Sequence, residues 1–207
     1  MTKVVFYGAS SVEGAGATSP ERRFSTIVCR ALGWEEVNLG IGGTTVTGRD
    51  DAGQVVAEES GIGRVPDVLD AGPDHVFILY GANDFAQSCP LGEPRLFRQG
   101  TFFWDYDTMI RGLLDGLEPG QITVSTCQYR VDAATPNALG LTLADYNRVI
   151  REAGERYGLC TLDPYADAGI DARNWPALAA DDAHLNDTGH EVLAAFFTES
   201  LRKHLCL

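Results

Sequence analysis

Short apolar runs alternate with helical repeats along this chain of 207 residues. Three of the runs are nearly continuous and are bounded by glycine, proline or polar residues: Lys3–Tyr7, His75–Tyr80 and Gln121–Thr126. A strand that is apolar on both faces is typical of a parallel sheet buried between two layers of helices. Two weaker runs, Glu36–Leu39 and Leu159–Leu162, bring the number of predicted strands to five.

Helical periodicity fills the segments between these runs. Apolar residues recur at every third and fourth position, and each segment has a start or stop signal, such as the Thr142 and Asp145 capping box or the stop at Gly33. Strands that alternate with helices predict an α/β fold with right-handed crossovers. The predicted helices cover Phe24–Leu32, Tyr106–Leu117, Thr142–Tyr157 and a last segment that Asn186 or Asp187 caps and that runs to Leu201.

One long region, Phe85–Asp105, shows no periodicity, because Pro90, Gly92, Pro94 and Gly100 interrupt it. Loops of this length in compact domains are commonly functional. No linker or internal repeat divides the chain, so we expect one domain over residues 1–207.

Charge and cysteine content narrow the class of protein. Sixteen basic and 29 acidic residues give a net charge of −13, which disfavours binding to nucleic acid. No run is long enough to insert in a membrane, and the first apolar run lacks the pattern of a signal peptide, so none is expected. The five cysteines form no CxxC pair, and Cys127 and Cys160 are expected as core thiols, so we expect a cytoplasmic protein.

The segment DDAHLNDTGH contains the most informative chemistry in the sequence. Asp181 stands three residues before His184, where a carboxylate can hold an imidazole in one tautomer for a serine nucleophile. The candidate serine is Ser10, directly after the first predicted strand in FYGASSVEG. Ser11 and Asp182 are the alternatives to Ser10 and Asp181.

Two further loops supply candidate oxyanion donors. Gly43 follows the second predicted strand and Asn83 follows the third, so the backbone N–H groups of Ser10 and Gly43 and the side-chain amide of Asn83 are candidates. Ligands bind beyond the carboxyl ends of the strands in open parallel sheets. All of these residues, with Asp181 and His184, are expected at that edge.

The ordered set of motifs resembles the SGNH hydrolases, also called GDSL esterases and lipases. The matching blocks are GASS at Gly8–Ser11, NLGIGG at Asn38–Gly43, GAND at Gly81–Asp84 and DDAH at Asp181–His184. The resemblance implies a flavodoxin-like three-layer α/β/α fold with a five-stranded parallel sheet in the order 2-1-3-4-5. It also implies Ser10 as the nucleophile, Gly43 and Asn83 in the oxyanion hole, and Asp181 and His184 as the rest of a catalytic triad.

Two positions depart from the family pattern. Ala9 stands where the family has a loop-ordering aspartate, and Leu185 stands where many members have proline. The first departure bears on rate and loop rigidity more than on the class of reaction.

The resulting hypothesis is a serine ester hydrolase that acts on small or carbohydrate-linked O-acyl esters. An acyltransferase that uses the same acyl-enzyme and a catalytically degenerate binding protein are the alternatives. The candidate substrate contacts are Trp104, in an aromatic cluster, and Tyr129 and Arg130, after the fourth predicted strand. No phosphate loop, dinucleotide motif or metal-ligand spacing is present, so neither a cofactor nor a metal is expected.

Overall fold

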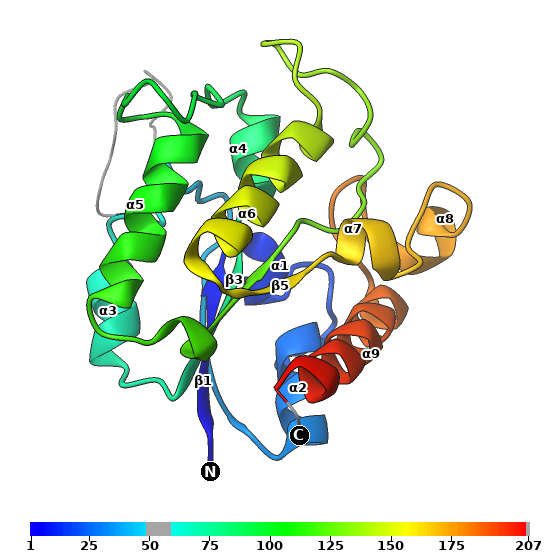
Figure 1. The fold of residues 1–207 in the computed structure, drawn as a ribbon. Coiled ribbons are helices and arrows are strands. Elements are labelled where there is room, and N and C mark those ends of the chain that lie inside the picture. The colour runs from blue at the N-terminus through cyan, green and yellow to red at the C-terminus, as the bar shows by residue number, and fades with distance from the viewer. Residues whose placement is uncertain (49–58, 206–207) are drawn as a thin grey trace.

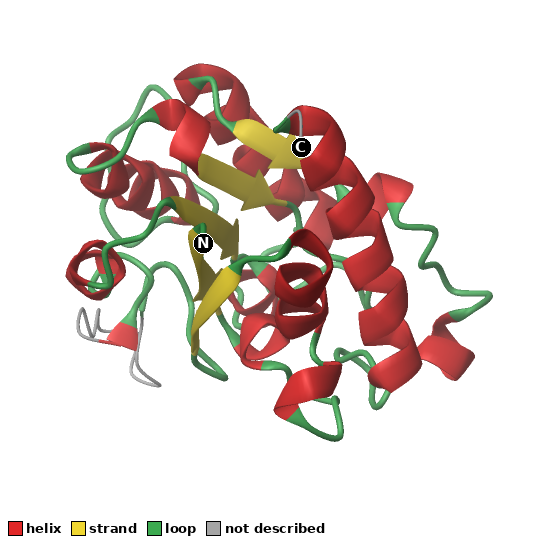
Figure 2. Ribbon diagram, turned by 90° about the horizontal axis from the view of Figure 1, so that it is seen from below, coloured by secondary structure: helices red, strands yellow, loops and turns green. Residues whose placement is uncertain are grey.

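A single parallel sheet forms the centre of the molecule (Figures 1 and 2). The computed structural model describes residues 1–48 and 59–205. Every neighbouring pair of strands is parallel, and their order is β2-β1-β3-β4-β5, as the resemblance implied. The strands are β1 (Lys3–Gly8), β2 (Glu35–Gly40), β3 (His75–Leu79), β4 (Ile122–Ser125) and β5 (Cys160–Leu162).

Helices cover both faces of this sheet, which confirms the three-layer α/β/α architecture (Figure 1). The longer helices are α2 (Phe24–Leu32), α3 (Val65–Asp70), α5 (Phe102–Leu114), α6 (Leu143–Tyr157) and α9 (Asp187–His204). Shorter helices are α1 (Ser10–Glu13), α4 (Ala82–Ala86), α7 (Pro164–Asp167) and α8 (Trp175–Leu178), and the 3-10 turn η1 (Pro20–Arg22) precedes α2. A further 3-10 turn, η3 (Pro119–Gln121), precedes β4.

Strand β1 shows how the sequence pattern creates two cores. Successive side chains of a strand point to opposite faces. Val5 and Tyr7 therefore join the core beneath α3, α5 and α6, while Val4 and Phe6 join the core beneath α2 and α9. All four side chains are fully buried, which is why the run reads as continuously apolar.

The predicted helix caps are confirmed. Thr142 and Asp145 form the capping box of α6, with the Thr142 N–H donating to Asp145 Oδ2 at 2.8 Å. Of the two candidate caps of the last helix, Asn186 is the one used, since its Oδ1 accepts the N–H of Gly189 at 3.0 Å.

The prediction of an irregular region over Phe85–Asp105 was wrong at both ends. Helix α4 extends to Ala86, and α5 begins at Phe102, four residues before the predicted start at Tyr106. The N–H groups of Phe102 and Phe103 donate to the carbonyls of Pro90 and Leu91, both at 2.8 Å. The returning loop thus satisfies amides that a helix start leaves without partners, a contact that local periodicity does not contain.

Of the two cysteines expected as core thiols, Cys127 is buried and Cys160 is only partly so. Burial raises the pKa of the Cys127 thiol to about 12, and Cys160 is half-buried. No disulfide joins the cysteines that the structure describes, and Cys206 lies outside the described residues. No helix within residues 1–48 and 59–205 has the length and apolar character needed to cross a bilayer.

His75, at the start of β3, makes the stability of the fold sensitive to acid. Its side chain is 5% exposed, its Nε2 lies 2.9 Å from Thr123 Oγ1, and burial lowers its pKa to about 4. An unfolded histidine binds a proton near pH 6.5, so stability is present above that pH and is lost as pH falls toward 4. Between pH 7.5 and pH 5 the free energy of unfolding falls, and we expect this fall to be smaller by about 2 kcal/mol in His75→Gln than in the parent protein.

Urea unfolding at the two pH values measures this difference directly. His204→Gln is the control, because His204 is an exposed histidine at the end of α9. Equal pH dependence in His75→Gln and the parent protein would contradict the prediction.

Candidate active site

Ser10 stands at a tight turn between β1 and α1. The turn leaves no room for a side chain at Gly8, where a Cβ would lie 2.4 Å from both Leu79 O and Val12 Cγ2. The carbonyl of Ala9 then accepts the N–H groups of Val12 and Glu13, both at 3.0 Å, which starts the helix at once. Ser10 is therefore presented at the carboxyl end of the central strand.

A continuous chain of hydrogen bonds joins Ser10, His184 and Asp181. His184 Nε2 lies 2.9 Å from Ser10 Oγ, and His184 Nδ1 lies 2.8 Å from Asp181 Oδ2. With the proton of the ring on Nδ1, the imidazole donates to the carboxylate and Nε2 can accept the serine proton. The structure brings together the three residues proposed from the sequence as the nucleophile, the base and the carboxylate that orients the base.

Asp181 is fixed by its own backbone surroundings. Its Oδ1 accepts the N–H groups of Ala183 at 2.8 Å and His184 at 2.7 Å. Burial raises the pKa of Asp181, but hydrogen bonds from the His184 ring and from these two amides outweigh it and lower the pKa below its ordinary value. The carboxylate is consequently ionised at neutral pH, as an acceptor for the imidazole must be.

The alternatives to these residues occupy other positions. Ser11 Oγ accepts a hydrogen bond from Gln128 Nε2 at 3.1 Å, and Gln128 is buried. Asp182 contributes its backbone carbonyl, which accepts the N–H of Val131 at 3.1 Å. The first contact ties the loop after β4 to α1, and the second ties it to the segment that carries His184.

The loop after β2 passes close to Ser10. A Cβ on Gly42 would lie 3.9 Å from Ser10 Cβ. Gly43 has a φ of +78°, a conformation that glycine adopts without strain. Asn38, at the start of this motif, donates from Nδ2 to Val12 O at 2.7 Å and so attaches α1 to β2.

Asn83 lies in α4, after β3, and faces the same loop. Its Nδ2 donates to Thr44 O at 2.8 Å, which uses one of the two hydrogens of the amide. Gln87, one turn later, donates to Gly43 O at 3.0 Å. The two predicted oxyanion motifs are thus bound to each other, and Asn83 retains a second hydrogen as a donor.

Asp84 is a residue of this site to which the sequence assigned no role. It is fully buried, and its carboxylate accepts the N–H groups of Val46 and Thr47 at 3.1 and 3.4 Å. Burial raises the pKa of Asp84 to about 7, against the effect of these hydrogen bonds. The sequence offered one indication of a role for Asp84, its position directly after Asn83 in the motif GAND.

The three candidate substrate contacts differ in their surroundings. Trp104 Nε1 donates to the carbonyls of Glu93 and Leu96 at 2.9 and 2.7 Å, and the Tyr129 ring makes an edge contact with Trp175. Within the described residues, neither Trp104 nor Tyr129 has a hydrogen bond to the Ser10, His184 and Asp181 chain.

Arg130 is nearer to the site motifs. Its Nη1 donates to Ala82 O at 3.4 Å, next to Asn83, and its Nη2 donates to Asp132 Oδ2 at 3.0 Å. The guanidinium also lies over the Phe85 ring, 5.6 Å from the centroid. Arg130 is therefore one half of an ion pair beside α4 rather than an isolated surface charge.

His190 has a structural position. It is buried, its Nδ1 accepts the N–H of Phe24, and its Nε2 donates to Ala15 O, both at 3.2 Å. Burial lowers the pKa of His190, although the bond to the Ala15 carbonyl raises it. A neutral His190 therefore connects α9 to the loop that follows Ser10.

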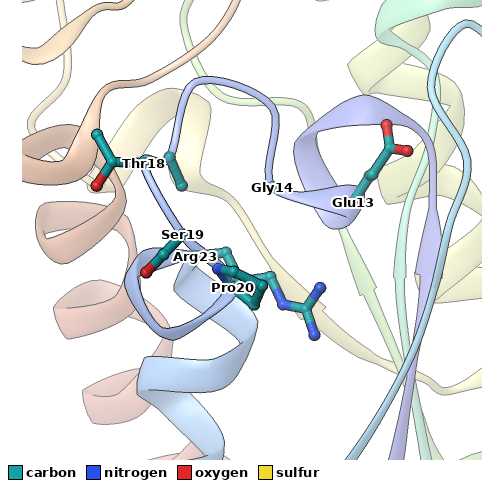
Figure 3. Close-up of a pocket in the computed structure, with 7 residues that line it drawn as sticks. Glu13, Gly14, Thr18, Ser19, Pro20 and Arg23 are labelled. Atoms are coloured by element: carbon teal, nitrogen blue, oxygen red, sulfur yellow. The ribbon is translucent and has the colours of Figure 1, made fainter.

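A small surface pocket of about 270 Å³ opens beside α1 (Figure 3). Glu13 and Gly14 form one side of it, and Thr18 and Ser19 form the other. Thr18 is fastened to α9 by Asp187, which accepts its N–H at 2.8 Å. Among the described residues, no group of three or more His, Cys, Asp or Glu side chains is arranged to hold a metal ion.

Comparison with known proteins extends over nearly the whole chain. The model of the GDSL-like lipase/acylhydrolase family matches residues 6–192. A protein of Lactobacillus plantarum has 22% identity and a TM-score of 0.81, with 98% of this chain and 97% of that chain covered. The lipase/acylhydrolase of Enterococcus faecalis has 24% identity and a TM-score of 0.72, with 98% and 96% covered.

A two-domain esterase active on acetylated mannans has 21% identity and a TM-score of 0.67. The superposition covers 98% of this chain and 49% of that esterase. At these identities the solved structures establish the likeness of fold. No match to the chain was found among curated proteins.

Proposed function

The chain belongs to the GDSL-like lipase/acylhydrolase family, and on that basis we propose that it is a serine ester hydrolase that works through an acyl-enzyme on Ser10. Family membership supports a hydrolase of small-molecule esters. The observation that carries the finer proposal is the hydrogen-bonded chain from Ser10 Oγ through His184 to Asp181.

The first half of the reaction forms the acyl-enzyme. Ser10 Oγ attacks the ester carbonyl carbon while its proton passes to His184 Nε2, and Asp181 stabilises the imidazolium that results. The negative oxygen of the tetrahedral intermediate accepts hydrogen bonds from the N–H groups of Ser10 and Gly43 and from Asn83 Nδ2. The bond to the leaving oxygen then breaks, and His184 returns its proton to the departing alcohol.

The second half releases the acid. His184 removes a proton from water, and the resulting hydroxide equivalent attacks the acyl carbon. The tetrahedral intermediate collapses, the carboxylic acid departs, and Ser10 Oγ recovers its proton from His184. The overall reaction consumes one ester and one water and yields one acid and one alcohol.

Small or carbohydrate-linked O-acyl esters are the proposed substrates. Ile41, two residues before Gly43, is 44% exposed, and Val131, bonded to Asp182, is 51% exposed. The backbones of both residues bond to site segments, Ile41 to Gly8 and Val131 to Asp182, and we propose that their side chains contact a short acyl chain. Of the three proposed substrate contacts, Arg130 is favoured over Trp104 and Tyr129 because its Nη1 bonds to Ala82 O, beside Asn83. The activity of a similar fold on acetylated mannans fits the carbohydrate-linked class.

Covalent labelling tests the proposal without knowledge of the substrate. We expect a fluorophosphonate probe to attach to Ser10, located by peptide mass spectrometry, because only an activated serine attacks phosphorus at a useful rate. His184→Ala removes the base and should abolish the adduct. Absence of labelling, or an adduct that persists in His184→Ala, would reject the proposed mechanism.

A further inference from the structure

A buried arginine lies beneath the candidate active site. Arg64, immediately before α3, is only 5% exposed. Its Nη1 donates to Leu39 O at 2.9 Å, and its Nη2 donates to Gly8 O at 3.2 Å. These carbonyls belong to the carboxyl ends of β2 and β1, four residues before Gly43 and two before Ser10.

The same guanidinium reaches a third strand end. Its Nη2 donates to Tyr80 Oη, and Tyr80 follows β3 three residues before Asn83. Its carbon lies 5.1 Å from the centroid of the Tyr7 ring, so an aromatic face covers the cation. The Arg64 side chain thus contacts the ends of β1 and β2 and the residue after β3. The segments that follow these three points contain Ser10, Gly43 and Asn83, the three proposed oxyanion donors.

The contact with Tyr80 continues toward Asn83. Tyr80 Oη lies 3.5 Å from Thr44 Oγ1, and the carbonyl of Thr44 accepts the Asn83 amide at 2.8 Å. The polar groups from Arg64 to Asn83 therefore form one connected set beneath the loop that carries Gly43.

The charge of Arg64 has no carboxylate partner in the described part of the chain. Among residues 1–48 and 59–205, no carboxylate forms an ion pair with it, and its Nε has no hydrogen-bond partner. Burying a cation is costly unless it is paired. Positions that break such a rule without an evident gain in stability are commonly functional ones.

We propose that Arg64 is a positioning residue that sets the spacing of the nucleophile loop and the two oxyanion loops. The inference rests on the function proposed above. The planar fork of arginine suits this task, since it presents donors in two fixed directions to two carbonyls, which the single ammonium of lysine does not. Without Arg64, no shared side chain would fix the distances between the segments of Ser10, Gly43 and Asn83, although these three residues themselves are unchanged.

Two substitutions separate positioning from mere stability. We expect Arg64→Ala to lower kcat for p-nitrophenyl acetate by about 10- to 100-fold, and KM to change by less than about threefold. Arg64→Lys should retain an intermediate kcat. Guanidinium chloride at about 20 mM should restore part of the activity of Arg64→Ala by filling the vacated space between the carbonyls, whereas sodium chloride should not.

Hydrogen exchange provides a readout that does not depend on turnover. In Arg64→Ala, amides of residues 9–15 and 40–45 should exchange faster, while the amides of α9 keep the rate of the parent protein. The control is Arg111→Ala, because Arg111 is an exposed arginine of α5 that pairs with Asp107. It should change neither exchange in the two loops nor kcat.

The inference is overturned if Arg64→Ala folds and keeps its kcat, or if exchange rises evenly through the protein and guanidinium restores nothing. If Arg64→Ala does not fold, Tyr80→Phe replaces it, since this variant keeps the buried ring and removes only the hydroxyl. Faster exchange at residues 40–45 with a severalfold lower kcat supports the inference, and unchanged values overturn it. Failure of the proposed function would appear instead as an unlabelled Ser10 in the parent protein, with the loop exchange still reporting on Arg64.

Discussion

Ser10→Ala is expected to lower kcat by at least about 10⁴-fold, with a melting temperature that stays close to that of the parent protein. The substitution removes the atom that forms the acyl-enzyme and leaves the oxyanion donors and the substrate contacts in place. The backbone of the turn is held by the Ala9 carbonyl and by α1, not by the Ser10 hydroxyl, so little stability is lost.

Hydrolysis of p-nitrophenyl acetate and a thermal melt measure the two parts of this prediction. Ser11→Ala is the matched control, because it removes the same hydroxyl from the adjacent residue and, among the described residues, breaks the side-chain bond from Gln128. Its kcat should stay within about tenfold of the parent value. Comparable activity in Ser10→Ala and the parent protein would eliminate Ser10 as the nucleophile.

Asp181→Asn should have the second-largest effect, a fall in kcat of about 10³- to 10⁴-fold. The asparagine amide can donate to His184 Nδ1, which favours the tautomer with its proton on Nε2. That tautomer cannot accept the proton of Ser10, whose oxygen lies 2.9 Å from Nε2. The hydrogen bond would remain while its direction is reversed.

Asp182→Asn makes the same change of charge one residue away. Asp182 is exposed, and the contact it makes to Val131 uses its backbone carbonyl. Its kcat should therefore remain within about twofold of the parent value. Equal losses in the two variants would mean that the general charge of the segment matters, and the specific role of Asp181 would be withdrawn.

The fold was largely predictable because the central strands are buried on both faces. Val4, Val5, Phe6 and Tyr7 are all fully buried, so this continuous apolar run was enough to predict the position of β1. Ser10, Asp181 and His184 could be proposed because each stands in a short motif beside a recognisable strand or helix.

Other features depend on contacts between distant segments. The start of α5 depends on carbonyls of Pro90 and Leu91, more than ten residues earlier. Arg64, in the unremarkable segment GIGRVPDV, acquires its surroundings only when three strand ends come together. Neither contact has a local signature in the sequence.

Ala9 leaves the loop after β1 without a carboxylate at this position, and other segments hold this loop. It is the N-cap of α1 and makes no capping hydrogen bond through its side chain, and its methyl group packs in the core. The turn is instead tied to other elements through Arg64 at Gly8, Asn38 at Val12 and His190 at Ala15. The conformation of this loop is thus held by side chains of other segments.

The separation of Ser10 and His184 by 174 residues has a consequence for biosynthesis. A ribosome makes β1 and the proposed nucleophile before it makes Asp181, His184 and α9. Until those residues have been made and have folded back beside α1, Ser10 is an ordinary alcohol with no base. A growing chain, or one that ends before His184, would therefore lack the proposed activity, which would begin only once His184 lies beside Ser10.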